Sequence, residues 1–325
     1  MKLTLDDARR LARDAFVRMG YPPDALASPV EHLIDCELRG LSFSGLARLV
    51  SIAERHRKYG APSQALSVQR ETPVSALVAG NDQIGYIVGQ KMTDLAIAKA
   101  REAGLAIIGG KDTWYTGMLS FYAEQVCAQG LMVMIFSNAA PWVAPYGGTE
   151  GRFGTNPVCF GFPFRDTPVI WDIGTSEIIH AQVLMAKRLG QPLPEGAAYD
   201  KDGMPTTDPD AALGGAFSVW GGHKGSGLAM MVQLMGMMAG SAPLPDDLSG
   251  FGMVMVAARP DLLCDAAEFE AGTETYIRAI RETRPVTDGP PVRMPFDRSR
   301  QDRARALARG WIDIPDEIHE MIVNL

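Results

Sequence analysis

The sequence predicts an α/β protein, and three features of the chain lead to this prediction. The first 60 of the 325 residues show the apolar spacing of helices. From Leu66 onward, short apolar runs that suit strands alternate with longer segments of helical spacing. Such alternation is typical of a layered arrangement of helices on a sheet. Two helical segments follow at the C-terminus, and we expect them to pack on the N-terminal helices.

The N-terminal region is expected to form three helices. Leu5–Arg18 carries acidic residues in its first turn, where the helix dipole favours them. Ser28 is a preferred N-cap residue and Pro29 a preferred first helical residue, so a second helix is expected to begin there. The third helix begins near Ser42, and Pro62 closes this helical module.

The middle of the chain is expected to supply the sheet and the helices that cover it. The predicted strands are Leu66–Arg70, Val74–Ala79, Leu105–Ile108, Leu131–Phe136, Val158–Phe162, Val169–Trp171 and Phe251–Ala257. The predicted helices are Ile84–Ala103, Tyr115–Ala128, Ser176–Leu189, Gly225–Ala239 and Cys264–Thr283, followed by terminal helices over 298–310 and 315–325. Gly225–Ala239 is apolar on almost every side, so we expect it to be buried.

Composition excludes several classes of partner. The net charge of −7, without a basic cluster, is not that of a nucleic-acid-binding protein. The sequence has no apolar run of membrane-spanning length and no signal-peptide pattern. Its four cysteines are widely spaced and show no metal-ligand pattern, so we expect reduced thiols in the cytoplasm, with neither disulfide nor metal.

A glycine-rich stretch, Val143–Pro157, connects two predicted strands and reads VAPYGGTEGRFGTNP. A connection of this length inside a compact fold suggests a functional loop, and glycine allows a backbone to approach a ligand closely. A solvent-exposed wide turn is the alternative interpretation, and the residues alone leave both open.

Three clusters, the first of them at the end of this stretch, combine backbone donors with hydroxyl groups or a cation just before a helix. They are FGTNP (Phe153–Pro157), WDIGTSE (Trp171–Glu177) and GGHKGSG (Gly221–Gly227). This arrangement suits phosphate groups, although each cluster taken singly is more typical of a capped helix start. The GxGxxG fingerprint of Rossmann domains is absent, as are the Walker, HExxH and GxSxG motifs.

Together, GGTEGRFGTNP, DIGTS, PTTDP and GGHKGSGLAMM resemble the type 2 malate/L-lactate dehydrogenase family. The likeness runs from LRGLSFSGLARL to RMPFDRS, nearly the whole chain. It implies an α/β fold with a non-Rossmann NAD(P)-binding sheet and a homodimer with its active site near the subunit interface. A helical module of residues 1–62, joined by 294–325, would then pack on an NAD(P)- and substrate-binding α/β domain of residues 63–293.

The resemblance also assigns a substrate site. Members of the family carry Ser-His-Gly-x-x-Arg on the third helix, and Phe43–Arg48 is the matching segment here. Arg48 is retained and is expected to bind the substrate carboxylate, because a guanidinium group binds carboxylates with two hydrogen bonds. The family's acid–base groups are replaced at three positions. Ser44 stands in place of the histidine, Tyr115 in place of a second histidine, and Gln182 in place of an aspartate.

Other residues are therefore candidates for the proton donor. Tyr115 can donate if Lys224 lowers its pKa, and His180 and His223 are the histidines nearest the recognised motifs. His32 is expected to be a surface or packing residue. The predicted catalytic residues are Ser44, Tyr115 and His180.

A substrate that carries its own proton is the other solution. A cyclic 2-imino acid is readily protonated, and hydride addition to its carbon needs no acid at the reacting atom. With Arg48 on the carboxylate and the hydroxyls of Ser44, Tyr115 and Thr155 around the ring, the sequence favours an NAD(P)H-dependent reductase of pyrroline- or piperideine-2-carboxylate. Two alternatives stay open: a 2-hydroxy acid/2-oxo acid dehydrogenase with a substitute proton donor, and a nucleotide-binding relative without turnover.

The resemblance also places the cofactor, which is expected to be NADPH, with NADH possible. Basic residues near the motifs, Lys187, Arg188, Arg293 and Arg298, favour the phosphorylated form. The expected cofactor-binding residues are Thr116, Gly117, Met118, Asp172, Gly174, Thr175, Ser176, His223, Lys224, Gly225, Arg293 and Arg298.

Overall fold

A computed structural model describes residues 1–165 and 167–325, and a seven-stranded sheet lies at its centre. The strand order is β2-β3-β4-β10-β5-β6-β7. Only β3 and β4 run parallel, and every other neighbouring pair is antiparallel. The strands are β2 (Ser67–Thr72), β3 (Ser75–Ile84), β4 (Leu105–Trp114), β5 (Met132–Ser137), β6 (Val158–Phe162), β7 (Val169–Ile173) and β10 (Phe251–Ala258). The predicted α/β fold is confirmed, and the mostly antiparallel sheet distinguishes it from the parallel Rossmann sheet.

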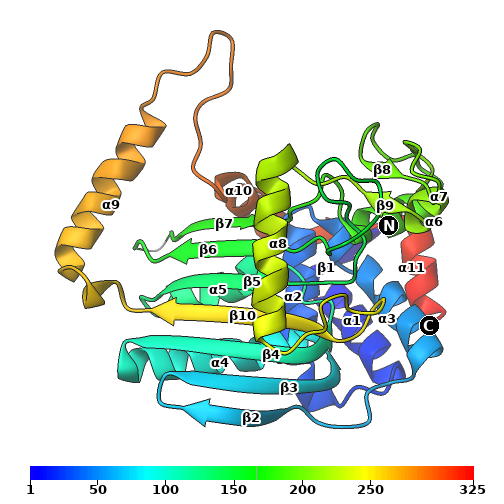
Figure 1. Cartoon of the computed structure of the whole chain (residues 1–325), viewed down its shortest axis with the longest axis horizontal. Helices are drawn as coiled ribbons and strands as arrows, with labels where there is room; N and C mark the ends of the chain where they lie inside the picture. Colours follow the sequence, from blue (N-terminus) through cyan, green and yellow to red (C-terminus); the bar gives the residue numbers. More distant parts are fainter. Residues whose placement is uncertain (166) are drawn as a thin grey trace.

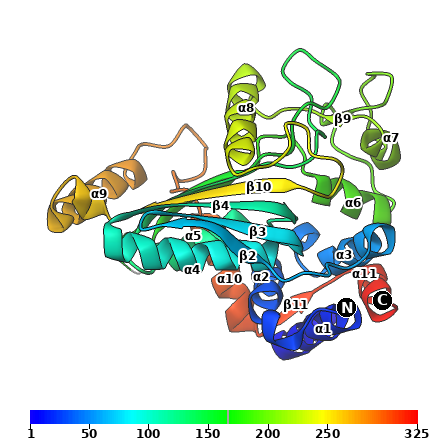
Figure 2. The same ribbon diagram turned by 60° about the horizontal axis from the view of Figure 1, so that its bottom comes forward.

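Helices cover the two faces of this sheet unequally. One face is covered by α4 (Gly85–Ala103) and α5 (Leu119–Cys127), and a large apolar core lies between them and the strands. On the other face, α8 (Gly222–Met238) crosses the strands alone (Figures 1 and 2). Helix α9 (Ala266–Arg281) stands away from the body of the molecule in Figure 1, and Ile277 is its one buried residue.

The two ends of the chain meet beside the sheet. Helices α1, α2 and α3 gather there with α10 and α11, and the short strands β1 and β11 pair antiparallel (Figure 2). The bounds are β1 (Lys2–Thr4), α1 (Leu5–Arg18), η1 (Pro23–Ala25), α2 (Ala27–Leu38), η2 (Ser42–Ser44), α3 (Ala47–Tyr59), α10 (Asp297–Arg309), β11 (Trp311–Asp313) and α11 (Asp316–Val323). The sequence did not predict β1 and β11, because three residues are too few to show a periodicity.

The glycine-rich loop belongs to a third packed region. It packs with α6 (His180–Arg188), β8 (Ala198–Tyr199), α7 (Pro209–Leu213) and β9 (Ala216–Phe217) around a small core that includes Val143, Phe153 and Phe217. A last 3-10 turn, η3 (Pro260–Leu262), precedes α9.

Three predictions about helices were wrong, besides the start of the third N-terminal helix, which was expected near Ser42 but lies at Ala47, after the separate 3-10 turn Ser42–Ser44. Helix α5 begins at Leu119 and not at Tyr115, because Tyr115 and Gly117 have φ angles of 50° and 75°, which no right-handed helix contains. Helix α6 begins at His180 and not at Ser176, because Ser176 forms a β-bridge with Val219.

The third correction concerns α8, which is not buried in a single chain. Its buried residues lie on one side, and the outer side exposes more than a third of each of Met230, Met231, Leu234, Met237 and Met238.

Candidate functional site

A cavity of about 240 Å³ lies where the N-terminal helices meet the ends of the central strands. The segment before α3 forms one wall, and the glycine-rich loop with the start of α6 forms another. Most of its lining is apolar or aromatic, with a few polar side chains among them, as in ligand sites generally. The lining includes Phe43, Ser44, Arg48, Tyr86, Tyr115, Thr116, Gly117, Met118, Trp142, Thr155, Asp172, Gly174, His180 and Phe251.

Among the described residues that line this cavity, Arg48 is the one arginine or lysine. It lies in the first turn of α3, with its guanidinium 4.2 Å from the ring centroid of Tyr115. Its Nη1 atom is buried and forms neither a salt bridge nor a hydrogen bond with any of residues 1–165 and 167–325. A buried charged donor without a partner is costly, so this geometry suits an anionic ligand.

Two neutral side chains add further unpaired polar atoms. The Tyr115 hydroxyl and His180 Nδ1 are buried, and neither makes a well-formed hydrogen bond within the described part of the chain. The His180 ring stacks on Trp142 at 4.1 Å between ring centroids. Burial, with a smaller contribution from Arg48, lowers the pKa of His180 to about 3, and burial raises the pKa of Tyr115. Both side chains are therefore neutral near pH 7.

The expectation that Lys224 lowers the pKa of Tyr115 was wrong. The cations that act on Tyr115 are Arg48 and Arg188, and burial outweighs them. Lys224 lies in the first turn of α8, outside the cavity.

The side chain of Asn156 joins the glycine-rich loop to neighbouring segments through hydrogen bonds. Its Nδ2 donates to the Ala229 carbonyl at 2.9 Å and to Gln233 Oε1 at 3.0 Å, both on α8. Its Oδ1 accepts from the Ala139 backbone N–H at 3.3 Å. These bonds hold the neighbouring Thr155 in the cavity wall.

The DIGTS segment lies behind the same wall. The buried Thr175 hydroxyl donates to the carbonyls of Thr155 and Asn156, both at 3.2 Å. Asp172 accepts from the Ser120 backbone N–H at 2.7 Å and so caps the start of α5. The Ser176 hydroxyl is buried without a partner among the described residues.

A wider groove of about 930 Å³ adjoins the cavity and shares Leu41, Met118 and Asp172 with it. Arg39, Arg284, Arg293 and Arg298 line it. Arg39 is paired with Asp35 and Glu124, whereas the other three arginines form no ion pair within residues 1–165 and 167–325. A basic groove that opens into a small apolar cavity fits a dinucleotide, whose phosphates need cations and whose nicotinamide needs a flat pocket.

The predicted cofactor residues fall into four groups. Thr116, Gly117, Met118, Asp172 and Gly174 line the cavity, and Arg293 and Arg298 line the groove. Thr175 and Ser176 are buried behind the cavity wall. His223, Lys224 and Gly225 open α8 and line neither space, and the His223 ring lies 6.2 Å from that of Tyr146.

Two other basic candidates are engaged elsewhere. Lys187 pairs with Asp210 at 2.5 Å, and Arg188 pairs with Glu54 at 2.7 Å. Neither is free for a cofactor phosphate, which corrects the sequence-based expectation. Gln182 also has a local role, because its Oε1 accepts from the Ile179 backbone N–H at 3.0 Å at the start of α6.

Sequence reasoning missed two residues of α2 that support the site. His32 was expected in packing or at the surface, yet it is fully buried and accepts a hydrogen bond from the Met118 backbone N–H. Glu37 is also buried and accepts from the Leu46 backbone N–H. Their positions on an amphipathic helix gave no signal for either role.

Within the described residues there is no group of three or more His, Cys, Asp or Glu side chains arranged to hold a metal ion. Nor does any described helix have the length and apolar character needed to cross a membrane.

Comparisons with known proteins agree with this geometry. The sequence model of the malate/L-lactate dehydrogenase family matches residues 3–323. An L-sulfolactate dehydrogenase of Methanothermobacter thermautotrophicus is 29% identical over 100% of this chain and 96% of its own length. A Delta(1)-pyrroline-2-carboxylate reductase of Burkholderia ambifaria is 31% identical over 99% of this chain and 97% of its own. The crystal structure of a delta1-piperideine-2-carboxylate reductase from Pseudomonas syringae superimposes with a TM-score of 0.83 at 28% identity, covering 100% of this chain and 99% of that one.

Proposed function

The chain belongs to the malate/L-lactate dehydrogenase family and is an oxidoreductase, and on that premise we propose that it reduces a small cyclic 2-imino acid with NAD(P)H. Pyrroline-2-carboxylate and piperideine-2-carboxylate are the substrates of this class that we favour. The observation that carries the proposal is Arg48 Nη1, which is buried without a partner among the described residues in a cavity whose histidine, His180, is neutral near pH 7.

Arg48 is the proposed carboxylate-binding residue. Its guanidinium would hold the acid through charge-assisted hydrogen bonds and thereby fix the position of the adjacent unsaturated carbon. Reduced nicotinamide, when bound, supplies a hydride to such a carbon. The aromatic walls, including Trp142 and Phe251, would exclude water, and the hydroxyls of Ser44, Tyr115 and Thr155, residues of the same lining, would contact the ring.

The protonation states favour C=N over C=O. Reduction of a ketone puts negative charge on oxygen, and a positioned acid normally contributes roughly 10²–10⁴-fold to the rate. His180 is neutral because burial lowers its pKa to about 3, and burial raises the pKa of Tyr115. Ser44 has an ordinary hydroxyl. A protonated cyclic imine needs no such acid, because the new C–H bond forms as the C=N⁺ electron pair moves onto nitrogen.

A 2-oxo acid dehydrogenase with Tyr115 or His180 as proton donor is the second candidate. Its support is the similarity to sulfolactate dehydrogenases, which is as high as the similarity to the imine reductase. The third reading, nucleotide binding without turnover, is disfavoured because Arg48 and the basic groove have no evident use in an idle protein.

NADPH is the proposed cofactor, with NADH as the alternative. The unpaired Arg284, Arg293 and Arg298 support it, since a 2′-phosphate adds negative charge that guanidinium groups bind well. A relative from Chromohalobacter salexigens is named (2R)-3-sulfolactate dehydrogenase (NADP(+)). In the proposed division, the cavity lies between the helical module of residues 1–62 and 294–325 and the α/β domain of residues 63–293.

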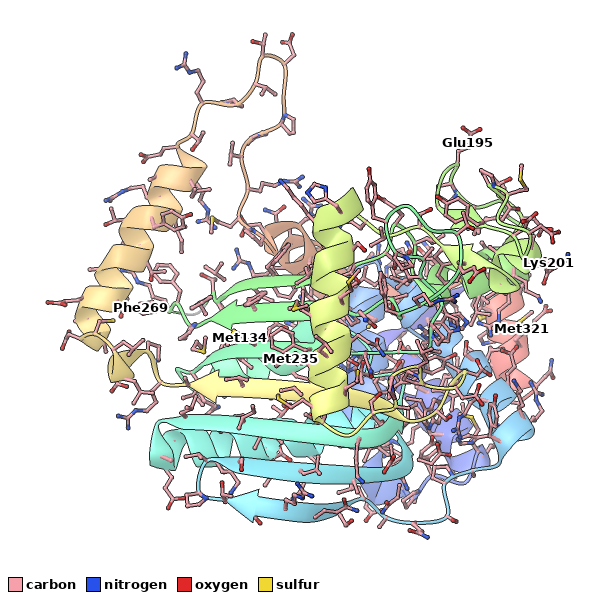
Figure 3. All side chains as sticks on the ribbon, in the orientation of Figure 1. Met134, Glu195, Lys201, Met235, Phe269 and Met321 are labelled. Carbon is pink, nitrogen blue, oxygen red and sulfur yellow. The ribbon has the colours of Figure 1, made fainter. Side chains whose placement is uncertain are left out.

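We also propose that the enzyme is a cytoplasmic homodimer. Besides the exposed side of α8, an apolar row in register across five strands lies on the open face of the sheet: Ile107, Val256, Met134, Phe160 and Trp171. Figure 3 shows Met134 of β5 and Met235 of α8 on this face, and Phe269 on α9. An apolar surface of this extent is typical of an interface, and a second copy is its proposed partner. The four cysteines are unpaired, which fits a reducing compartment.

The function is tested by a titration followed by a substrate panel. NADPH is titrated into the protein, and its oxidation is then followed with both cyclic imino acids, pyruvate, oxaloacetate and 3-sulfopyruvate. We expect turnover with at least one cyclic imine. Turnover with 2-oxo acids alone would support the second candidate, and tight NADPH binding without turnover on any acid would support the third.

A further inference from the structure

Two of the three buried polar side chains of helix α2, His32 and Glu37, line neither the cavity nor the groove described above. His32 is fully buried, and Glu37 is 7% exposed. They lie five residues apart on the helix. Glu37 contacts the segment before α3, and His32 contacts the segment before α5. Neither is used in the chemistry proposed above.

Glu37 reaches the segment that carries Ser44 and Arg48. Its Oε1 accepts from the Leu46 backbone N–H at 2.7 Å. Leu46 directly precedes α3, where a backbone N–H has no acceptor within the helix. A Cβ atom at Gly45 would lie 2.3 Å from the same Oε1, so the carboxyl group occupies the space beside that glycine. Glu37 thus holds the backbone between Ser44 and Arg48 at its N–H side, and Arg188 Nη1, which donates to the Ala47 carbonyl at 3.4 Å, adds a second side-chain contact.

His32 reaches the segment Thr116–Met118. Its Nε2 accepts from the Met118 backbone N–H at 2.8 Å, and a Cβ atom at Gly117 would lie 2.4 Å from this nitrogen. The bond assigns the ring proton to Nδ1. Burial lowers the pKa of His32 to about 3, so the acceptor stays available throughout the neutral range. Tyr86 and Phe121 flank the ring, with centroids 4.6 and 4.5 Å away.

The two contacts share one design. In each, a buried acceptor of α2 binds a backbone N–H next to a glycine, and that glycine leaves no room for a side chain. Loss of a buried acceptor leaves the backbone donor unpaired, so the segment is expected to move until water or another group satisfies it.

We propose that Glu37 and His32 are positioning residues with separate targets. Glu37 sets the position of Arg48 and so controls affinity for the carboxylate. His32 sets the position of Thr116–Met118 and so controls affinity for the nicotinamide cofactor. The inference rests on the proposed function for the identity of the two ligands.

The test measures two dissociation constants by calorimetry, without turnover. The ligands are NADPH and pyrrole-2-carboxylate, a planar acid that cannot accept a hydride, titrated into NADPH-saturated protein. Glu37→Ala is expected to weaken the binding of the acid by about tenfold and to leave the dissociation constant of NADPH within about twofold. His32→Ala is expected to weaken the binding of NADPH by about tenfold and to leave the dissociation constant of the acid within about twofold. Glu37→Gln and His32→Gln each supply an amide oxygen as the acceptor, so their affinities should lie closer to the wild type than those of the alanine variants.

Glu31→Ala is the matched control, because Glu31 is an exposed carboxylate on the same helix that pairs with Arg9. It should change neither constant. If an alanine variant does not fold, Glu37→Asp, which withdraws the carboxyl group by one methylene, and His32→Asn replace it. The proposal is overturned if either variant weakens both ligands equally, or lowers the melting temperature while both constants stay unchanged.

Failure of the proposed function has a different signature. Wild-type protein that binds both ligands but reduces no imino or oxo acid contradicts the function and leaves the positioning test valid. Wild-type protein that binds neither ligand contradicts both.

Discussion

At the residue scale, the proposed function depends on one cation, Arg48, whose Nη1 has no partner among the described residues. Most arginines of the chain with little exposure are paired, such as Arg39 with Asp35 and Arg55 with Asp82. Arg48 instead lies over the Tyr115 ring with its Nη1 buried and unpaired among the described residues. The sequence predicted this residue from its place in a family motif. It gave no indication that the neighbouring His180 would be neutral, because the burial that lowers its pKa is a property of the folded chain.

Replacing Arg48 by alanine should reduce kcat/KM for the acid substrate by roughly 10²-fold or more. The physical reason is the loss of a charge-assisted, two-point contact with the carboxylate. Steady-state kinetics and NADPH titration check it, and NADPH affinity should stay within about twofold. Arg57, exposed on the same helix, is the control, and Arg57→Ala should behave as the wild type. An Arg48→Ala variant with unchanged KM would contradict the assignment.

His180 should make the protein less stable in acid. Its folded-state pKa of about 3 lies below the unfolded value near 6.5, so the unfolded chain binds the proton more readily. The stability contribution is fully present above pH 6.5 and is lost as the pH falls toward 3. Between pH 7 and pH 5, one such histidine accounts for about 2 kcal/mol of lost unfolding free energy.

Urea unfolding of wild type and His180→Phe at both pH values measures this contribution. Phenylalanine keeps a ring against Trp142 but does not titrate, so the variant should lose about 2 kcal/mol less than wild type over this range. His319→Phe, on the partly exposed surface of α11, serves as the control. Equal acid sensitivity of His180→Phe and wild type would show that His180 is not held neutral.

At the scale of elements, local signals identified most strands and helices but not where each site segment begins. The end of α4 was predictable, because Gly104 adopts the left-handed conformation that glycine favours at a helix C-terminus. The start of α5 was not, because Tyr115 adopts a positive φ angle that its residue type does not signal. That error is informative, since the irregular backbone from Tyr115 to Met118 is part of the cavity wall.

The glycine-rich loop is predicted to depend on Asn156. Its side chain is buried and joins the loop to α8 and to the chain after β5. Asn156→Gly keeps the backbone freedom that the φ angle of 33° requires but removes all three hydrogen bonds. We expect a loss of about 2–4 kcal/mol in unfolding free energy, measured by urea denaturation. Asn324→Ala, at the exposed end of α11, should change it by less than about 0.5 kcal/mol. A loss below about 1 kcal/mol for Asn156→Gly would show that the loop is held by other contacts.

At the scale of the whole molecule, α4 and α5 cover one face of the sheet, whereas α8 covers only part of the other face. Composition predicted that α8 is apolar, but a single sequence cannot tell whether an apolar helix is covered by its own chain or by another. The exposed Met231 and Leu234, together with the apolar row on the sheet, indicate a partner, which we propose to be a second copy.

Charges placed on this surface should therefore dissociate the proposed dimer. Met231→Lys combined with Leu234→Lys puts two desolvated cations at the proposed interface, and sedimentation velocity should then show a monomer. Val17→Lys, at an equally exposed apolar position on α1, should leave the dimer intact. A double variant that sediments like the wild type would move the interface elsewhere.

The central claim, reduction of C=N in preference to C=O, is tested most directly by competition in one mixture. Equal concentrations of pyrroline-2-carboxylate and oxaloacetate are incubated with the enzyme and limiting NADPH. The products are separated, and their amounts are compared by mass spectrometry. We expect nearly all of the reducing equivalents to be recovered in the cyclic amino acid. A mixture in which malate predominates would contradict it.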